Sequence, residues 1–146
     1  MTEPWQDKTI VIVDDSKPSR DQLEKLYTSM GLKVLKTLES GLAALEVIPH
    51  VNPDFVSLDI IMPEMDGIEC YFKLRDLELP CDVFLVSALS LESRVVGVYA
   101  DEIPQAAFLP KPLTEEVLRH YFEGLYNGEH KIKAKEDKES DSAKEE

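Results

Sequence analysis

The sequence predicts an α/β fold with a five-stranded parallel sheet that helices cover on both faces. Short apolar runs alternate with segments whose apolar residues repeat at helical spacing, and this pairing occurs five times along the chain. Right-handed crossovers between parallel strands place the helices on the two faces of such a sheet. With 146 residues the chain has the usual size of one domain.

The first strand and helix follow each other near the N-terminus. Residues Thr9–Val13 form a β-branched apolar run, typical of a strand buried on both faces, and it stops at Asp14-Asp15. Pro18 suits a first helical position, and Gly31 suits the left-handed residue that ends a helix. The apolar residues expected to face inward are Leu23, Leu26, Tyr27 and Met30.

The second and third units repeat this pattern. A strand at Lys33–Leu38 precedes a short helix with Ser40 as its N-cap, which we expect to end before Pro49. Its inward residues are expected to be Leu42, Leu45 and Ile48. The third unit consists of a strand at residues 54–58 and a helix at Gly67–Asp76, with Ile68, Tyr71 and Phe72 facing inward.

The last two units complete the sheet. A buried strand is predicted at residues 83–86, followed by a helical stripe of Leu91, Val95, Val98 and Tyr99. A short strand is predicted at residues 107–109. The final helix has Thr114 as its N-cap and two glutamates at its positive end. Its inward residues are expected to be Val117, Leu118, Tyr121, Phe122 and Leu125.

Composition and charge exclude several classes of protein. The chain carries 29 acidic and 16 basic residues, a formal charge of −13, so nucleic acid would be repelled. It has neither a secretory leader nor an apolar run long enough to span a membrane, so we expect a cytoplasmic protein. Cys70 and Cys81 have no metal-ligand spacing and are expected to be reduced.

The domain organisation is predicted to be simple. We expect a lead at residues 1–7, one domain at residues 8–127 and a disordered charged tail at residues 128–146. The tail contains no aromatic residue, and Ile132 is its only large apolar residue, so it cannot bury enough surface to order itself. A second output domain would not fit, so the domain is expected to stand alone.

Five polar residues are predicted at the carboxyl ends of strands, where open parallel sheets bind ligands: Asp14, Asp15, Asp59, Ser87 and Lys111. Three carboxylates repel one another unless a cation lies among them, and hard oxygen ligands suit Mg²⁺. The lysine adds a positive charge, while the Ser87 hydroxyl and the Ala88 backbone N–H could donate to anionic oxygens. This set predicts a site for a phosphoryl group.

The same residues resemble the receiver domains of response regulators. Four pieces carry the resemblance: Asp14-Asp15, the run Asp-Ile-Ile-Met-Pro-Glu-Met-Asp-Gly at residues 59–67, Ser87-Ala88 and Lys111-Pro112. Together they span about residues 9–126 and occur in the order of that family. The resemblance implies a flavodoxin-like fold with strand order 2-1-3-4-5, an order known from the chemotaxis regulator of the family.

The resemblance also assigns roles to these residues. Asp59 would be the phosphoacceptor. Mg²⁺ would be held by the carboxylates of Asp14, Asp15 and Asp59 and by the backbone carbonyl of Ile61. Lys111 would contact the phosphoryl oxygens.

Further roles concern switching and hydrolysis. Ser87 and the Ala88 backbone N–H would close on the phosphoryl group, and Phe108 would turn inward with Ser87 as the aromatic switch. In receivers, two positions orient the water that removes the phosphoryl group. Here these positions hold Ile61 and Leu89, which are both apolar.

As a receiver, the chain would be a stand-alone response regulator of a two-component phosphorelay and a signalling domain rather than an enzyme. A sensor histidine kinase or a phosphotransfer protein would supply the phosphoryl group from a phosphohistidine. An output protein would bind the face formed by the helix that carries the Leu91 to Tyr99 stripe, the strand at residues 107–109 and the final helix. The protein would be a monomer or a phosphorylation-dependent dimer.

Two alternative functions stay open at this point. A metal-dependent aspartyl phosphatase of the haloacid dehalogenase type carries a second aspartate two residues after its nucleophile, but Ser16 occupies that position after Asp14. A receiver-like scaffold without phosphotransfer would not need the complete set of carboxylates, hydroxyl and lysine.

Overall fold

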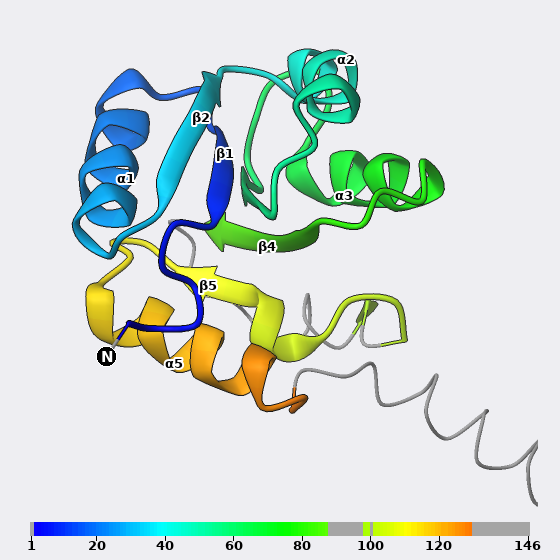
Figure 1. Cartoon of the computed structure of the whole chain (residues 1–146). Coiled ribbons are helices and arrows are strands. Elements are labelled where there is room, and N and C mark those ends of the chain that lie inside the picture. Colours follow the sequence, from blue (N-terminus) through cyan, green and yellow to red (C-terminus); the bar gives the residue numbers. More distant parts are fainter. Residues whose placement is uncertain (1, 88–97, 100, 130–146) are drawn as a thin grey trace, which may run out of the picture.

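A computed structural model describes residues 2–87, 98, 99 and 101–129 of the chain (Figure 1). Five strands form one parallel sheet in the order β2-β1-β3-β4-β5. The strands are β1 (Thr9–Val13), β2 (Lys33–Leu38), β3 (Phe55–Asp59), β4 (Asp82–Ser87) and β5 (Phe108–Pro110). This arrangement confirms the predicted fold and strand order.

The helices cover both faces of the sheet, with α1 and α5 on one face and α2 and α3 on the other (Figure 1). Their bounds are α1 (Lys17–Ser29), α2 (Gly41–Val51), α3 (Gly67–Asp76) and α5 (Glu115–Tyr126), and a 3-10 turn, η1 (Gln105–Ala107), precedes β5. Each helix starts after a residue whose side chain accepts a backbone N–H three residues on: Ser16, Ser40, Asp66 and Thr114. The helix predicted around Leu91 and Val95 lies mostly outside the described residues.

The end of α2 differs from the prediction. We expected α2 to end before Pro49, but the helix continues to Val51. Proline removes one helical hydrogen bond, yet the last turn is stabilised by the burial of Ile48 and by Asn52. Asn52 has a left-handed backbone with φ 48°, and its N–H donates to the Ile48 carbonyl. Leu42, which was expected to face inward, is 55% exposed.

Two strands are also shifted by one residue. Strand β3 extends to Asp59, which is paired with Val86 of β4, so the predicted phosphoacceptor belongs to the sheet itself. Strand β5 starts at Phe108 rather than Ala107, because η1 takes up the residues before it. The main chain of Asp59 is therefore fixed by its pairing with β4.

The hydrophobic core includes a residue of the predicted N-terminal lead. Trp5 is 1% exposed and stacks on Phe122 of α5 with ring centroids 5.2 Å apart. Phe55 of β3 also packs on Phe122, with ring centroids 4.8 Å apart. Outside this cluster, the Arg119 guanidinium lies 5.3 Å above the Trp5 ring and is bonded to Glu3 at 2.9 Å. Residues 1–7 thus include one of the largest buried side chains of the protein.

Two further observations concern the cysteines and the helices. Cys70 and Cys81 are both buried and carry free thiols. Among the residues that the structure describes, no helix has the length and apolar character needed to cross a membrane.

Candidate functional site

The residues predicted to act together are found at one edge of the sheet. Asp14 and Asp15 follow β1, Asp59 ends β3, Ser87 ends β4 and Lys111 follows β5. All these strands are parallel, so their carboxyl ends meet at the same edge. One carboxylate oxygen from each of the three aspartates lies within 4.8 Å of the other two. The structure thus brings the predicted carboxylates together.

Asp14 is the innermost of the three aspartates, with no exposed surface. Its Oδ1 accepts the backbone N–H of Ser16 at 2.8 Å. Its Oδ2 accepts two donors, the Nζ of Lys111 at 2.6 Å and the Oγ of Ser19 at 2.6 Å. The main-chain carbonyl of the same residue accepts a hydrogen bond from Arg20 at 2.7 Å.

Sequence reasoning missed Ser19 and Arg20. Both lie in the first turns of α1, where a serine or an arginine is usually a surface residue. A carboxylate immediately before a helix N-terminus could have suggested that the first turn folds back on it. The residue types by themselves do not indicate which side chain does so.

Asp59 lies beside Asp14 and is 7% exposed. The Lys111 Nζ donates to its Oδ1 at 3.3 Å. Burial and the negative charge of Asp14 raise the pKa of Asp59 to about 6, and the charge of Lys111 opposes this shift only in part. The lysine therefore leaves uncompensated negative charge in the site.

The balance of charges in the site indicates whether these residues could hold a metal ion. Three carboxylates within reach of one another and a single lysine leave room, in charge and in ligand type, for a hard divalent cation. Asp15 is exposed, so a cation could keep part of its water shell on that side. The donor set fits Mg²⁺.

The loop after β3 returns closely over the end of the strand. Its Gly67 N–H donates to the carbonyl of Ile60 at 2.7 Å, and a Cβ on Gly67 would lie 2.1 Å from the carbonyl oxygen of Asp59. A side chain does not fit at that distance, so glycine is required there for close approach. Asp66 then caps α3 by accepting the N–H of Glu69. The run that carries the resemblance thus packs directly on the main chain of Asp59.

The remaining predicted site residues differ in how deeply they are buried. Ser87 is 1% exposed, and its carbonyl accepts the N–H of Lys111 at 2.7 Å, which joins the ends of β4 and β5. Phe108 is 6% exposed, while Ile61 is 55% exposed. Ala88 and Leu89 lie outside the described residues.

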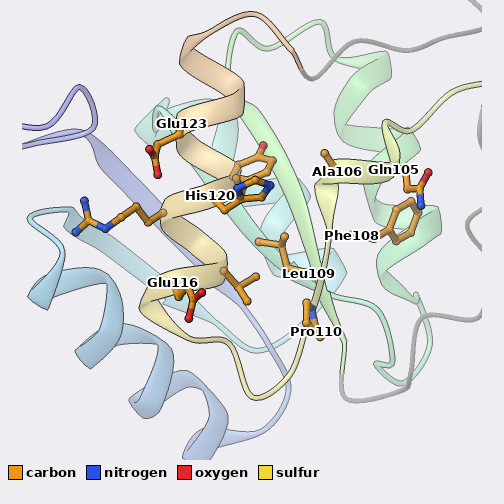
Figure 2. A pocket seen from close by; sticks show the side chains of 11 residues that line it. Gln105, Ala106, Phe108, Leu109, Pro110, Glu116, His120 and Glu123 are labelled. Atoms are coloured by element: carbon orange, nitrogen blue, oxygen red, sulfur yellow. The ribbon is translucent and has the colours of Figure 1, made fainter.

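Two hollows lie close to these elements. One hollow, of about 500 Å³, lies between the start of α1 and the loop after β5. Ser19, Leu23, Lys111 and Leu113 are among the residues that line it. The other, of about 780 Å³, lies between β5 and α5 (Figure 2). Phe108 and Leu109 line it from the strand, and Glu116, His120 and Glu123 line it from the helix.

Comparison with known proteins places this chain in one family. Residues 10–123 match the family model described as "Response regulator receiver domain". The chain is 32% identical over 105 residues to the chemotaxis protein CheY of Bacillus subtilis, covering 70% of this chain and 84% of that protein.

Other relatives are longer proteins. The chain is 37% identical over 106 residues to a protein-glutamate methylesterase/protein-glutamine glutaminase of Oleidesulfovibrio alaskensis, covering 72% of this chain. It spans only 28% of the length of that relative.

Solved structures agree with the sequence comparison. The chain matches a structure described as the CheX-CheY-BeF3-Mg+2 complex from Borrelia burgdorferi with a TM-score of 0.71 and 29% identity, covering 83% of this chain and 90% of that one. It also matches the signal receiver domain of the response regulator NarL from Mycobacterium tuberculosis with a TM-score of 0.67 and 31% identity, covering 81% and 95%.

Proposed function

Because this chain belongs to the family of response regulator receiver domains, we propose that it accepts a phosphoryl group on Asp59 and thereby changes its affinity for a protein partner. One observation carries the proposal. Asp59 is a buried carboxylate at the end of β3, and it lies between a lysine and two further aspartates. A buried carboxylate in that position is costly for stability, and a function explains why it is present.

The proposed transfer is an in-line displacement. An oxygen of Asp59 attacks the phosphorus of a phosphohistidine on a sensor histidine kinase or phosphotransfer protein. The P–N bond breaks, its electron pair returns to the histidine ring, and an acyl phosphate forms on Asp59. Such a reaction depends mainly on positioning and charge stabilisation, because the protein supplies little covalent chemistry beyond the nucleophile.

Charge stabilisation is assigned to the residues around Asp59. The carboxylates of Asp14, Asp15 and Asp59 would hold Mg²⁺ with the backbone carbonyl of Ile61, and the ion would neutralise charge on the phosphoryl oxygens. Lys111, already 3.3 Å from Asp59, would pair with a phosphoryl oxygen. Its ammonium already lies in the site before the reaction starts, closer to Asp14 than to Asp59.

The response is proposed to travel through β4 and β5. Ser87 and the Ala88 N–H would receive the phosphoryl oxygens, and Phe108 would change its packing with Ser87. Phe108 lines the hollow between β5 and α5, so a change there alters a surface that a partner could bind (Figure 2). We therefore assign the output partner to the face that β5 and α5 would form with the helix predicted around Leu91 and Val95, which lies mostly outside the described residues.

The relatives support this assignment at the level of signalling. The Borrelia structure joins CheY with CheX, Mg and BeF3, so we propose that this chain too binds Mg²⁺ with a phosphoryl group. We further propose that it is a monomer or a phosphorylation-dependent dimer. Methylesterase activity is not carried over, because the match covers 28% of that relative. We propose a signalling domain rather than an enzyme.

Labelling of the purified protein tests the proposal. Incubation with acetyl phosphate and MgCl₂ should add the mass of one phosphoryl group, as measured by intact mass spectrometry. Asp59→Asn and excess EDTA should each abolish the addition. Asp82→Asn is the matched control, because Asp82 starts the neighbouring strand at the opposite edge of the sheet and should not affect labelling. Equal labelling of the Asp59→Asn variant would contradict the assignment.

A further inference from the structure

The Asp14 carboxylate is held at both of its oxygens, by the N-cap of α1 and by the first turn of that helix. The Ser16 N–H donates to Oδ1 at 2.8 Å, and the Ser19 hydroxyl donates to Oδ2 at 2.6 Å. Because this segment places a donor on each oxygen, the carboxylate cannot rotate about its Cβ–Cγ bond without breaking a hydrogen bond. Its orientation is therefore fixed by the protein rather than by a ligand.

Lys111 cannot replace Ser19 in this role. Its Nζ donates to the same Oδ2 at 2.6 Å and also to Asp59 at 3.3 Å. An ammonium on a flexible four-carbon stem follows its partners rather than fixing them. As a cation among the three carboxylates, it also competes with a divalent ion for the same oxygens, whereas a neutral hydroxyl does not.

We propose that Ser19 is a positioning residue for the metal ion: its hydroxyl keeps the Asp14 carboxylate turned so that a divalent cation finds the site already formed. The inference rests on the proposed function, because it concerns the ion that phosphoryl transfer requires. Outer partners of this kind orient metal-binding carboxylates, and their removal typically lowers metal affinity by about 10- to 100-fold.

The helix does not need the Ser19 side chain. The cap of α1 is the Ser16 Oγ, which accepts the backbone N–H of residue 19, and a substitution of the side chain leaves that bond in place. Serine, threonine and valine also have similar helix propensities. A change in metal binding can thus be separated from a loss of the helix.

An isosteric pair isolates the hydroxyl. Ser19→Thr keeps the donor and Ser19→Val replaces it by a methyl group of similar size, and both variants are β-branched. Ser29→Ala is the matched control, because Ser29 ends the same helix and its hydroxyl donates to the Leu26 carbonyl. MgCl₂ is titrated into each metal-free protein by isothermal titration calorimetry, and far-UV circular dichroism checks the fold.

The expected result is a Kd for Mg²⁺ that rises about tenfold in Ser19→Val and stays within about twofold of wild type in Ser19→Thr and Ser29→Ala. Equal affinities of the valine variant and wild type would overturn the inference. Equal weakening in the valine and threonine variants would also overturn it, since the hydroxyl would then not matter. A wild-type protein that binds no Mg²⁺ would overturn the proposed function together with the inference.

Discussion

The Nζ of Lys111 lies 2.6 Å from Oδ2 of Asp14, closer than its 3.3 Å distance to Oδ1 of Asp59. The two residues are 97 positions apart in the chain, so the ion pair joins the carboxyl ends of β1 and β5 across the site. Asp14 is fully buried, and the lysine is its compensating charge. Lys111 is also the residue proposed to pair with a phosphoryl oxygen once Asp59 is phosphorylated.

We expect Lys111→Met to lower the free energy of unfolding by about 3 kcal/mol in EDTA, because it leaves a buried carboxylate without its charge partner. Saturating MgCl₂ should recover much of this loss, since the ion supplies the missing positive charge. Urea unfolding monitored by circular dichroism measures both values. Lys17→Met, which removes only an exposed pair with Asp21, should cost less than about 1 kcal/mol. An equal loss with and without MgCl₂ would show that charge compensation is not the cause.

The pH dependence of stability should report the raised pKa of Asp59. The pKa rises from 3.8 to about 6 in the folded protein, mainly through burial and the nearby Asp14 charge. A carboxyl group whose folded pKa is raised destabilises the fold above that pKa, and the penalty disappears as the pH falls towards the unfolded value. Asp59→Asn should therefore stabilise the metal-free protein near neutral pH, by up to about 3 kcal/mol.

The measurement is urea unfolding in EDTA over a range of pH. The advantage of Asp59→Asn should shrink as the pH falls from about 6 towards 3.8, because wild-type Asp59 then becomes protonated in the folded state. Asp21→Asn is the control, since Asp21 is exposed and pairs with Lys17 on the surface of α1. An advantage that does not vary with pH would argue against titration of Asp59 as its source.

Removal of the Trp5 side chain should destabilise the domain strongly. Trp5 is 1% exposed and stacks on Phe122, so Trp5→Ala should cost about 3–5 kcal/mol, as is typical for large aromatic residues in a core. Circular dichroism must monitor unfolding, because Trp5 is the only tryptophan of the chain. Glu3→Gln, which removes only an exposed partner of Arg119, should cost less than about 1 kcal/mol. Equal costs for the two variants would mean that the N-terminal segment adds nothing to the core.

Phosphorylated Asp59 is expected to hydrolyse slowly. The two positions that orient water in receivers hold Ile61 and Leu89, and neither side chain can hydrogen-bond water. Groups that act as true acids or bases contribute about 10² or more to such a rate, and groups that only position water contribute less. Loss of the phosphoryl mass over time should therefore be slow in wild type and faster in the double variant Ile61→Asn, Leu89→Glu. Rapid loss in wild type would contradict the prediction.

Much of the fold follows from local patterns in the sequence. The caps at Ser40 and Thr114 and the left-handed Gly31 lie where the residue types predicted them, because capping and turn conformations depend on a few neighbouring atoms. The end of α2 was predicted wrongly. Pro49 favours a break locally, but the burial of Ile48 and the Asn52 cap extend the helix.

By itself, the sequence determined that Asp14, Asp59, Ser87 and Lys111 share one edge of a sheet, because parallel strands align their carboxyl ends whatever contacts their side chains make. Only the tertiary structure decided which donors hold Asp14 and that Trp5 belongs to the core. The Ser19 hydroxyl, the Lys111 ammonium and the Phe122 ring take their partners from the packing of α1, β5 and α5. Such contacts depend on the three-dimensional approach of whole elements, which no local pattern encodes.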